Sequence, residues 1–204
     1  MTDFDRNDVE ILEDKLGWAG FFKLRAIQLR HRLFQGGWGK PINRELMERG
    51  LAVGVLPYDP ATDSVLLIEQ FRVGGLNREA GPWMMELVAG LIDKEESPQE
   101  VARREAEEEA GITLGELEPV ANYFSSPGGS DEYFYLFCGC CDLTAAGGYY
   151  GLPEEGEDIK AQVLSVDDAL ANMARGHIDN AHTIIALQWL QLNRSRLRQQ
   201  WQDK

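Results

Sequence analysis

Four glutamates gather near the end of one predicted helix. Glu105, Glu107, Glu108 and Glu109 occupy the turns before Gly111, where negative charge opposes the helix dipole at a cost of roughly 0.3–1 kcal/mol each. With 3.6 residues per turn, Glu105 and Glu109 share one face and Glu108 lies beside them. Converging carboxylates suit a hard divalent cation such as Mg²⁺, which takes oxygen ligands. Charge placed so densely against a local rule predicts a metal site.

The residues that flank this helix predict its ends. Ser97 and Glu100 fit a capping box, and Pro98 takes the first helical position, where its missing N–H does no harm. Gly111 is expected to end the helix. The alternative is a solvated acidic face with arginine–glutamate pairs four residues apart, which is the better explanation of an arbitrary acidic helix.

A longer fixed pattern surrounds the helix and disfavours that alternative. Residues 90–112 fit G-x5-E-x7-R-E-U-x-E-E-x-G-U, with U a bulky or aliphatic residue, and only Ala106 departs from it. This segment resembles the Nudix box of the Nudix hydrolase superfamily. The resemblance implies that Glu96 pairs with Arg104 to fix the loop against the helix. It also implies metal ligation by the carbonyl of Ala89 and by the carboxylates of Glu105, Glu109 and Glu108, the last to a second ion or through water.

A proline and several longer stretches narrow the resemblance. Pro127 stands sixteen positions past Gly111, as in the ADP-ribose pyrophosphatase branch of the family. Stretches across nearly the whole chain are also similar to that branch, among them RHRLFQGG, RELMERG, LIEQFR, PWMMELVAG, SSPGGS and HIDNAHTIIALQWLQL. The implied activity is hydrolysis of the diphosphate of ADP-ribose to AMP and ribose 5-phosphate. The implied cofactor is Mg²⁺, two or three ions, for which Mn²⁺ can substitute.

The same resemblance assigns substrate contacts outside the box. The diphosphate is expected to contact Arg72, adenine to stack on Phe21 or Phe22, and the rest of the substrate to be reached by Arg44, Glu45, Ser126, Gly128 and Glu132. Each assignment has a plainer alternative. Arg72 could be an exposed arginine at a strand end, the phenylalanines could be sheet core, and the glycines could form an ordinary turn.

An acidic loop at residues 151–158 is the second source of carboxylates. In the resembled enzymes such a loop closes over the substrate, with Glu155 as the general base and Glu157 as a further metal ligand. Arg104, Glu108 and Glu155 are therefore the expected catalytic residues. Gly156 departs from the family pattern between the two loop carboxylates. An exposed acidic loop without a catalytic role remains the alternative.

Composition excludes several other classes of protein. The chain has 204 residues and a formal net charge of −14, which disfavours binding to a nucleic-acid backbone. Neither a signal peptide nor a membrane span is expected, because the N-terminus is acidic and the apolar runs are strand-length. Cys138, Cys140 and Cys141 cannot all pair with one another, which favours the cytoplasm. Zinc is disfavoured because no second cysteine pair or nearby histidine completes a site.

Hydrophobic patterning predicts the elements that position these residues. Strands are expected within 21–34, at 51–57, 64–71, 84–88 and 133–141, and helices after Ser165 and near Asn180. This order predicts an α/β fold, and the resemblance makes it a Nudix α/β/α sandwich with a mixed central sheet. Residues 1–48 are expected to form a small N-terminal antiparallel β domain for dimerisation and substrate contacts, and residues 49–204 the hydrolase domain.

The resemblance also implies a homodimer that exchanges its N-terminal domains. Two other functions remain open. One is a pyrophosphatase for another nucleotide sugar, such as ADP-glucose or GDP-mannose, since base and sugar contacts come from loops of weak specificity. The other is a non-catalytic ADP-ribose-binding regulator, which the intact box and the acidic chain disfavour.

Overall fold

The computed structural model describes residues 4–93, 95–152 and 156–202. They form two compact units, each with its own internal contacts. The first unit comprises Met1–Gly50 and Phe124–Tyr133, and the second comprises Leu51–Tyr123 and Phe134–Lys204. Within the described residues, no helix is both long and apolar enough to span a membrane.

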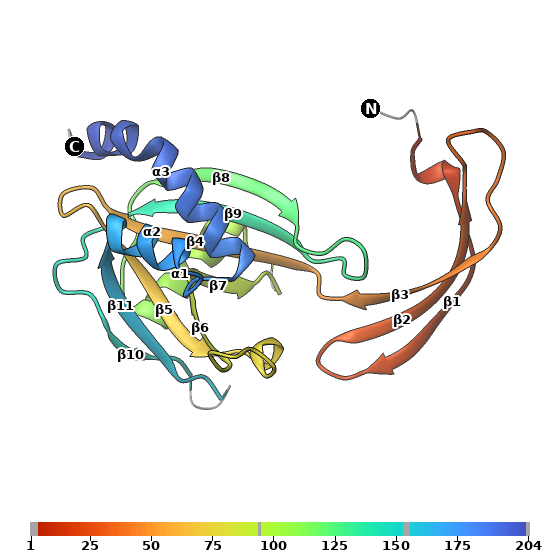
Figure 1. Ribbon diagram of the computed structural model, residues 1–204, viewed down its shortest axis with the longest axis horizontal. Coiled ribbons are helices and arrows are strands. Elements are labelled where there is room, and N and C mark those ends of the chain that lie inside the picture. The colour runs from red at the N-terminus through yellow and green to blue at the C-terminus, as the bar shows by residue number, and fades with distance from the viewer. Residues whose placement is uncertain (1–3, 94, 153–155, 203–204) are drawn as a thin grey trace. The chain divides into compact units, whose positions relative to one another are not determined.

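The first unit is built on a three-stranded antiparallel sheet, drawn in red and orange in Figure 1. Its elements are the short 3-10 helix η1 (Arg6–Asp8) and the strands β1 (Val9–Ala19), β2 (Lys23–His31) and β3 (Ile42–Glu48). β2 lies between the other two strands. The tip of the hairpin between β8 (Leu117–Phe124) and β9 (Tyr133–Cys140) joins this unit, because the Met47 N–H donates to the Gly129 carbonyl at 2.8 Å.

The second unit holds an eight-stranded sheet. The strands β10 (Gly148–Tyr150), β11 (Ile159–Ser165), β5 (Ser64–Phe71), β4 (Leu51–Asp59), β9 (Tyr133–Cys140) and β8 (Leu117–Phe124) follow one another across it, while β6 (Trp83–Glu86) pairs with β5 and β7 (Val88–Leu91) pairs with β4. The short 3-10 helix η2 (Val73–Gly75) follows β5. Backbone bonds from Tyr133 to Gly50 and from Cys141 to Tyr58 show that β9 runs parallel to β4. The sheet is therefore mixed.

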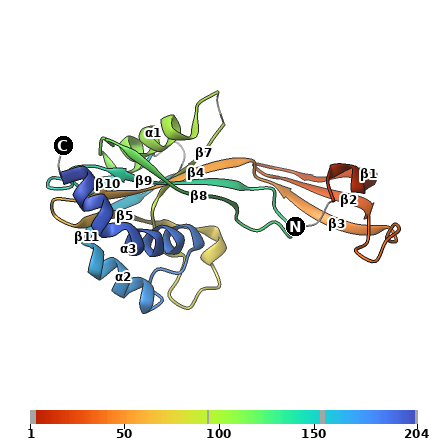
Figure 2. The ribbon, with the colours of Figure 1, turned by 90° about the horizontal axis from the view of Figure 1, so that it is seen from above.

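Helices cover both faces of this sheet (Figure 2). Helix α1 (Pro98–Ala110) lies on one face, and α2 (Val166–Ala174) and α3 (Ala181–Gln202) lie on the other. Side chains alternate across a strand, and β5 sends Val65 and Leu67 into one buried cluster and Leu66 and Ile68 into the other. Burial on both faces explains why the central strands read as continuous apolar runs. The α/β/α sandwich is confirmed.

Several local predictions are confirmed. Ser97 caps α1, Glu100 completes the capping box, and Gly111 ends the helix in the left-handed conformation at φ 63°. Gly111 is also the point where the Tyr150 ring packs against the helix end, since a β-carbon there would lie 2.6 Å from that ring. Ser165 caps α2.

The antiparallel sheet predicted at the N-terminus is confirmed, and the segment 21–34 contributes one strand to it, β2. Its neighbour β1 escaped prediction because register shifts between Ile11 and Glu13, and between Leu16 and Trp18, interrupt its alternation. The strand expected at 84–88 is divided at Leu87, where the chain leaves β5 and joins β4. The strands β3, β8, β10 and β11 were also missed.

A partly buried ionic contact ties the β4–β5 turn to α3. The carboxylate of Asp63 accepts bonds from the Tyr58 hydroxyl at 2.8 Å and from Arg194 Nε at 2.9 Å, and it pairs with Arg198 at 3.2 Å. The hydrogen bond from Arg194 is the main reason that the pKa of Asp63 lies below its usual value. The charged carboxylate therefore stabilises the fold above the ordinary pKa of an aspartate, and that stabilisation is lost as the pH falls through the lowered pKa.

Asp63→Asn should lower the stability at pH 7 by about 1–3 kcal/mol, the typical contribution of hydrogen bonds to a charged group. Thermal melts of variant and wild type should differ less as the pH falls below the ordinary pKa of aspartate, and they should converge once it lies below the lowered pKa of Asp63. Asp167→Asn is the matched control, because Asp167 also pairs with Arg194 but its side chain is 77% exposed, so little change is expected. Equal losses in both variants would contradict a special role for Asp63.

Candidate active site

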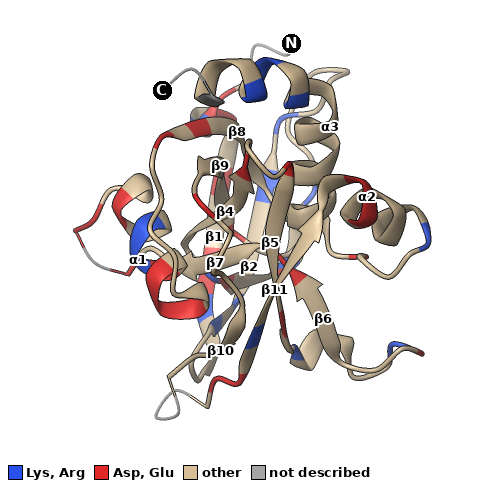
Figure 3. Cartoon of the chain, turned by 90° about the vertical axis from the view of Figure 1, so that its left-hand side faces the viewer, with Lys and Arg blue, Asp and Glu red and all other residues tan. Residues whose placement is uncertain are grey.

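The box helix α1 presents a cluster of carboxylates around one arginine. Nη1 of Arg104 lies 2.9 Å from Glu105 Oε1 and 2.9 Å from Glu108 Oε2, and its Nε lies 3.5 Å from Glu96 Oε1. The predicted contact of Glu96 with Arg104 is therefore present. Arg104 Nε and Glu96 Oε2 are buried and lack a hydrogen-bond partner among the residues that the structure describes. Figure 3 shows the acidic and basic segments of α1.

Strand β7 lies directly against this helix. A β-carbon on Gly90 would fall 2.0 Å from Glu105 Oε1, so only glycine leaves room for the carboxylate at that point. One residue earlier, the Ala89 N–H donates to Glu109 Oε2 at 3.1 Å. The box glycine and the box glutamates are thus parts of one close contact between strand and helix.

Burial disfavours the charged form of two box carboxylates, those of Glu105 and Glu109. Glu109 is 4% exposed, and desolvation raises its pKa to about 8. The hydrogen bond from the Ala89 N–H lowers this pKa, and the charges of Glu105 and Glu157 raise it further. Desolvation also raises the pKa of Glu105, and the neighbouring charges of Glu108 and Glu157 add to that rise. Glu105 and Glu109 on α1 and Glu157 on the loop before β11 therefore interact electrostatically.

The donor set fits a hard divalent cation. It consists of buried carboxylate oxygens whose negative charges repel one another. A bound cation would offset that repulsion. Across the described ranges 4–93, 95–152 and 156–202, no three His, Cys, Asp or Glu side chains are close enough together to hold a metal ion. Arg104 draws Glu105 and Glu108 to itself, so metal binding requires these side chains to turn.

Arg72 lies at the end of β5, as predicted, and pairs with a residue that sequence reasoning missed. Its Nε donates to Glu86 Oε2 at 2.7 Å, and the Glu86 side chain is 15% exposed against 43% for Arg72. The charge of Arg72 lowers the pKa of Glu109, which places it close to the acidic cluster. The sequence offered one signal for Glu86, its position as the acidic residue within PWMMELVAG, and no periodic pattern in that stretch points to a partner.

The acidic loop is described only in part. Glu155, the expected general base, lies outside the described residues. Glu157 accepts a bond from the Leu152 N–H at 3.2 Å, and its own N–H donates to the Leu152 carbonyl at 3.2 Å. Gly156 has φ 73°, a conformation that favours glycine. The departure from the family pattern at Gly156 thus matches the backbone of this loop.

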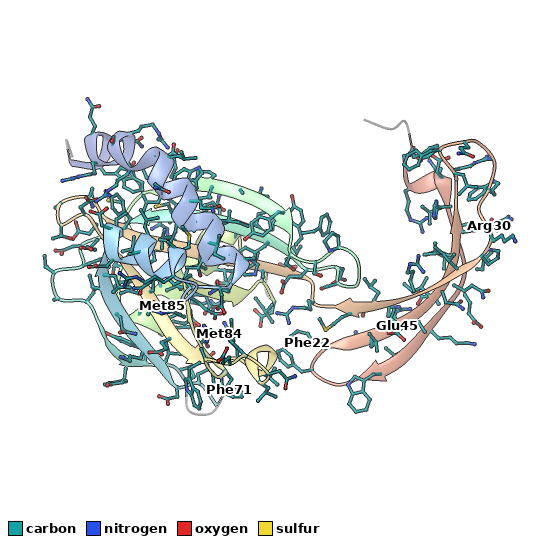
Figure 4. All side chains as sticks on the ribbon, viewed as in Figure 1. Phe22, Arg30, Glu45, Phe71, Met84 and Met85 are labelled. Carbon is teal, nitrogen blue, oxygen red and sulfur yellow. The ribbon has the colours of Figure 1, made fainter. Side chains whose placement is uncertain are left out.

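The first unit holds a pocket of about 580 Å³ that contains several predicted substrate residues. Arg44, Glu45 and Gly128 line it, and Figure 4 marks Glu45 on β3. Sequence reasoning missed other polar lining residues, namely Glu13, Lys15, Gln28 and Asn43. Gln28 Nε2 donates to Asn43 Oδ1 at 3.2 Å, across the β2–β3 pair. No residue of this pocket belongs to the second unit.

The two candidate adenine-stacking residues lie in the turn between β1 and β2. Phe21 is 86% exposed, so the alternative of sheet core is wrong for this ring. Phe22 packs edge-on against Phe21, with ring centroids 4.8 Å apart, and the Arg49 guanidinium lies 4.4 Å from the Phe22 centroid. Arg49 was not predicted, although it lies in the RELMERG stretch.

The remaining predicted contacts lie at the β8–β9 tip. The Ser126 carbonyl accepts bonds from the N–H groups of Gly129 and Ser130, as in an ordinary turn. Glu132 is buried, and its carboxylate accepts from Arg49 Nε at 2.6 Å and from the Ser125 hydroxyl at 2.6 Å. Glu132 thus has a structural role in the first unit, whatever it contributes to binding.

A comparison with known families matches the box and its surroundings. The model described as "NUDIX domain" matches residues 48–187, which is more than half of the chain. The chain belongs to the Nudix family. The contacts around Glu105, Glu109 and Arg104 are accordingly those of a Nudix box, and the prediction of family is confirmed.

Relatives extend this Nudix assignment over nearly the full length. The chain is 44% identical to "ADP-ribose pyrophosphatase" of Escherichia coli K12, over 97% of this chain and 95% of that protein. It is 45% identical to the protein of the same name from Haemophilus influenzae, over 97% and 93%. It is 34% identical to "GDP-mannose pyrophosphatase" of Cronobacter sakazakii, over 91% and 96%. A "Crystal structure of ADP compounds hydrolase" shares the fold, with a TM-score of 0.69, 20% identity and coverage of 95% and 96%.

The raised pKa of Glu109 predicts how stability depends on pH in protein kept free of metal by a chelator. Between pH 4.5 and about 8 the folded Nudix domain retains a proton on Glu109 that the unfolded chain releases, so stability falls as the pH rises through this window. Glu109→Gln removes the titration and should stabilise the protein at pH 8 by on the order of 5 kcal/mol, with a gain near zero at pH 4.5.

Thermal or urea unfolding across this range measures the gain. Glu107→Gln is the control, because Glu107 lies on the same helix but is exposed, and it should show no gain that grows with pH. A stability difference for Glu109→Gln that is constant with pH would refute the prediction.

Proposed function

We propose that this chain is an ADP-ribose pyrophosphatase that hydrolyses ADP-ribose to AMP and ribose 5-phosphate. The observation that carries this is the joint presence of the buried box carboxylates and a full-length similarity of 44–45% to proteins with that name. In the reaction a water oxygen bonds to one phosphorus, the bond from that phosphorus to the bridging oxygen breaks, and the bridging oxygen leaves with the other phosphate.

Each residue then has a proposed part. Glu105, Glu109, Glu108, Glu157 and the Ala89 carbonyl would hold two or three Mg²⁺ ions, for which Mn²⁺ can substitute. The ions would supply charge neutralisation and an activated water. Glu155 would take the proton of that water. Arg72 offers a guanidinium that suits phosphate oxygens, held by Glu86 at 2.7 Å, and Arg104 keeps the loop of Glu96 against α1.

Binding of the base and the terminal ribose is proposed for the first unit. Arg44, Glu45 and Gly128 line its pocket, and an exposed Phe21 beside Phe22 offers a surface for stacking. Ser126 and Glu132 belong to the same unit. We infer a division of roles between residues 1–48, for dimerisation and substrate contacts, and residues 49–204, for hydrolysis.

We also infer a cytoplasmic homodimer with exchanged N-terminal domains and no nucleic-acid or membrane partner. The three cysteines are free thiols, which suits a reducing compartment. Large apolar side chains lie exposed on the first unit, among them Trp18 at 66%, Phe21 at 86% and Phe34 at 83%. Such exposure is typical of an interaction surface.

A substrate panel tests the activity. With Mg²⁺, ADP-ribose should be cleaved with a higher kcat/KM than ADP-glucose or GDP-mannose, and chromatography should identify AMP and ribose 5-phosphate. Glu155→Gln should lower kcat by about 10²–10⁴-fold, as expected for loss of a general base, and Glu109→Gln should also abolish most turnover. Glu107→Gln is the matched control on the same helix and should keep its activity. Preferred cleavage of GDP-mannose would support the rival substrate.

Complementation tests the exchanged dimer. Arg44→Ala and Glu109→Gln should each inactivate a homodimer, and a random mixture of the two chains should recover about a quarter of the activity, since half of the dimers are mixed and each has one complete site. This result requires that Arg44 serve the site of the partner subunit. No recovery in a mixture that sedimentation shows to contain mixed dimers would rule out the exchange.

A further inference from the structure

The stretch HIDNAHT at residues 177–183 has no part in the proposed chemistry, yet it makes specific contacts with the strand that leads into the box. It forms the corner between α2 and α3. Asn180 Nδ2 donates to the Met85 carbonyl at 2.7 Å, and the Leu87 N–H donates to Thr183 Oγ1 at 2.9 Å. Thr183 has no exposed surface. Figure 4 labels Met85 on β6.

These contacts complete one edge of a short strand. β6 pairs with β5 along its other edge, in the register Glu86 to Ile68 and Met84 to Gln70. In an antiparallel strand, alternate residues direct their backbone groups to opposite edges. The groups of Trp83, Met85 and Leu87 therefore face away from β5, where an unpaired buried group would cost free energy.

Side chains bond to three of those outward groups. Arg78 Nη1 donates to the Trp83 carbonyl at 3.3 Å, and Asp179 holds the same arginine through its Nε at 2.6 Å. Asn180 bonds to the outward carbonyl of Met85, and Thr183 accepts from the outward N–H of Leu87. The corner thus takes the place that a neighbouring strand would fill in a wider sheet.

Strand β6 and the residues that follow it carry groups of the candidate site. Glu86 lies between Met85 and Leu87 and pairs with Arg72 at 2.7 Å. Ala89 follows two residues after Leu87 and donates to Glu109 at 3.1 Å. A shift of β6 would therefore move both the partner of the proposed phosphate-binding arginine and the backbone that meets the metal-binding glutamate.

The contacts of Asn180 with Met85 and of Thr183 with Leu87, called the clamp from here on, are coupled to the start of α3. The Asn180 side chain accepts a bond from the Thr183 N–H at 3.1 Å through Oδ1 while it donates to Met85 through Nδ2. One amide thus caps the helix and holds the strand, so the strand position follows from the helix start.

We propose that Asn180 and Thr183 are positioning residues for the active site, holding β6 so that Arg72 and Glu109 keep their working geometry. The inference rests on the proposed pyrophosphatase activity. It predicts a kinetic effect from residues that touch neither substrate nor metal.

Three variants and a control test this. Thr183→Val removes the acceptor for the Leu87 N–H, and Thr183→Ser retains it. Asn180→Asp retains an acceptor for the helix cap but presents an oxygen to the Met85 carbonyl. Ser165→Ala is the control, because it removes the cap of α2, whose Ser165 Oγ accepts from the Asp168 N–H at 3.0 Å, without contact to β6.

Kinetics at a temperature where every variant is folded should separate positioning from stability. Thr183→Val and Asn180→Asp should each lower kcat/KM by about tenfold or more, since small displacements at a reacting centre cost up to about 10²-fold. Thr183→Val should chiefly raise the Mg²⁺ concentration for half-maximal activity, and Asn180→Asp should chiefly raise the KM for ADP-ribose. Thr183→Ser should restore wild-type values, and Ser165→Ala should lower Tm without changing either constant.

Hydrogen–deuterium exchange in the metal-free protein supplies a second readout. Peptides that cover residues 83–91 should exchange faster in Thr183→Val and Asn180→Asp but not in Ser165→Ala. If the first two variants fold and keep wild-type kinetics, or if Ser165→Ala loses as much activity, the proposal is overturned. Should Thr183→Val fail to fold, Asn180→Asp decides by the same measurements. If the wild type does not cleave ADP-ribose, the proposed function fails, while exchange at 83–91 still reports on the clamp.

Discussion

The active-site region depends on one electrostatic constraint, which is the burial of Glu105 and Glu109 against strand β7. Gly90 leaves room for the first carboxylate, and the Ala89 N–H bonds the second. Burial raises the pKa of both groups, so the metal-free site cannot hold its full negative charge at neutral pH without cost. Arg104 offsets part of that charge. A cation would offset the rest, which is why these residues suit metal chemistry better than a purely structural role.

Elements on both faces of the sheet hold the strands that bury these carboxylates. Helix α1 presses on β7 from one face, while the α2–α3 corner on the opposite layer reaches the edge of β6 through Asn180 and Thr183. A strand as short as β6 cannot fix its own position, because it pairs with only one strand, β5, in the described part of the chain. Its geometry comes from side chains about a hundred residues later in the chain, so the site depends on the whole second unit rather than on the box alone.

Local rules were sufficient for the box helix and for the β4–β5 pair. Ser97, Pro98 and Gly111 act through neighbouring backbone groups, and strand patterning in residues 51–71 is strong because both faces are buried. The missed features depend on tertiary contacts. Bulges hid β1, the partnership of Glu86 with Arg72 spans two strands, and the pocket of Arg44 includes Gln28 and Lys15 from neighbouring strands. No period in the sequence encodes such pairings.

The division into two units has a consequence for specificity. The box carboxylates and Arg72 belong to the second unit, whereas Arg44, Glu45 and Gly128 belong to the first. Under the proposed function, a substitution in the pocket of the first unit would change the groups that meet a base or a sugar while it leaves the buried cluster of Glu105 and Glu109 intact. Relatives of similar length with the names ADP-ribose pyrophosphatase and GDP-mannose pyrophosphatase fit this separation. Since the geometry of the box carboxylates is set by burial between β7 and α1, and the pocket by pairing between β2 and β3, selection can act on one without disturbing the other.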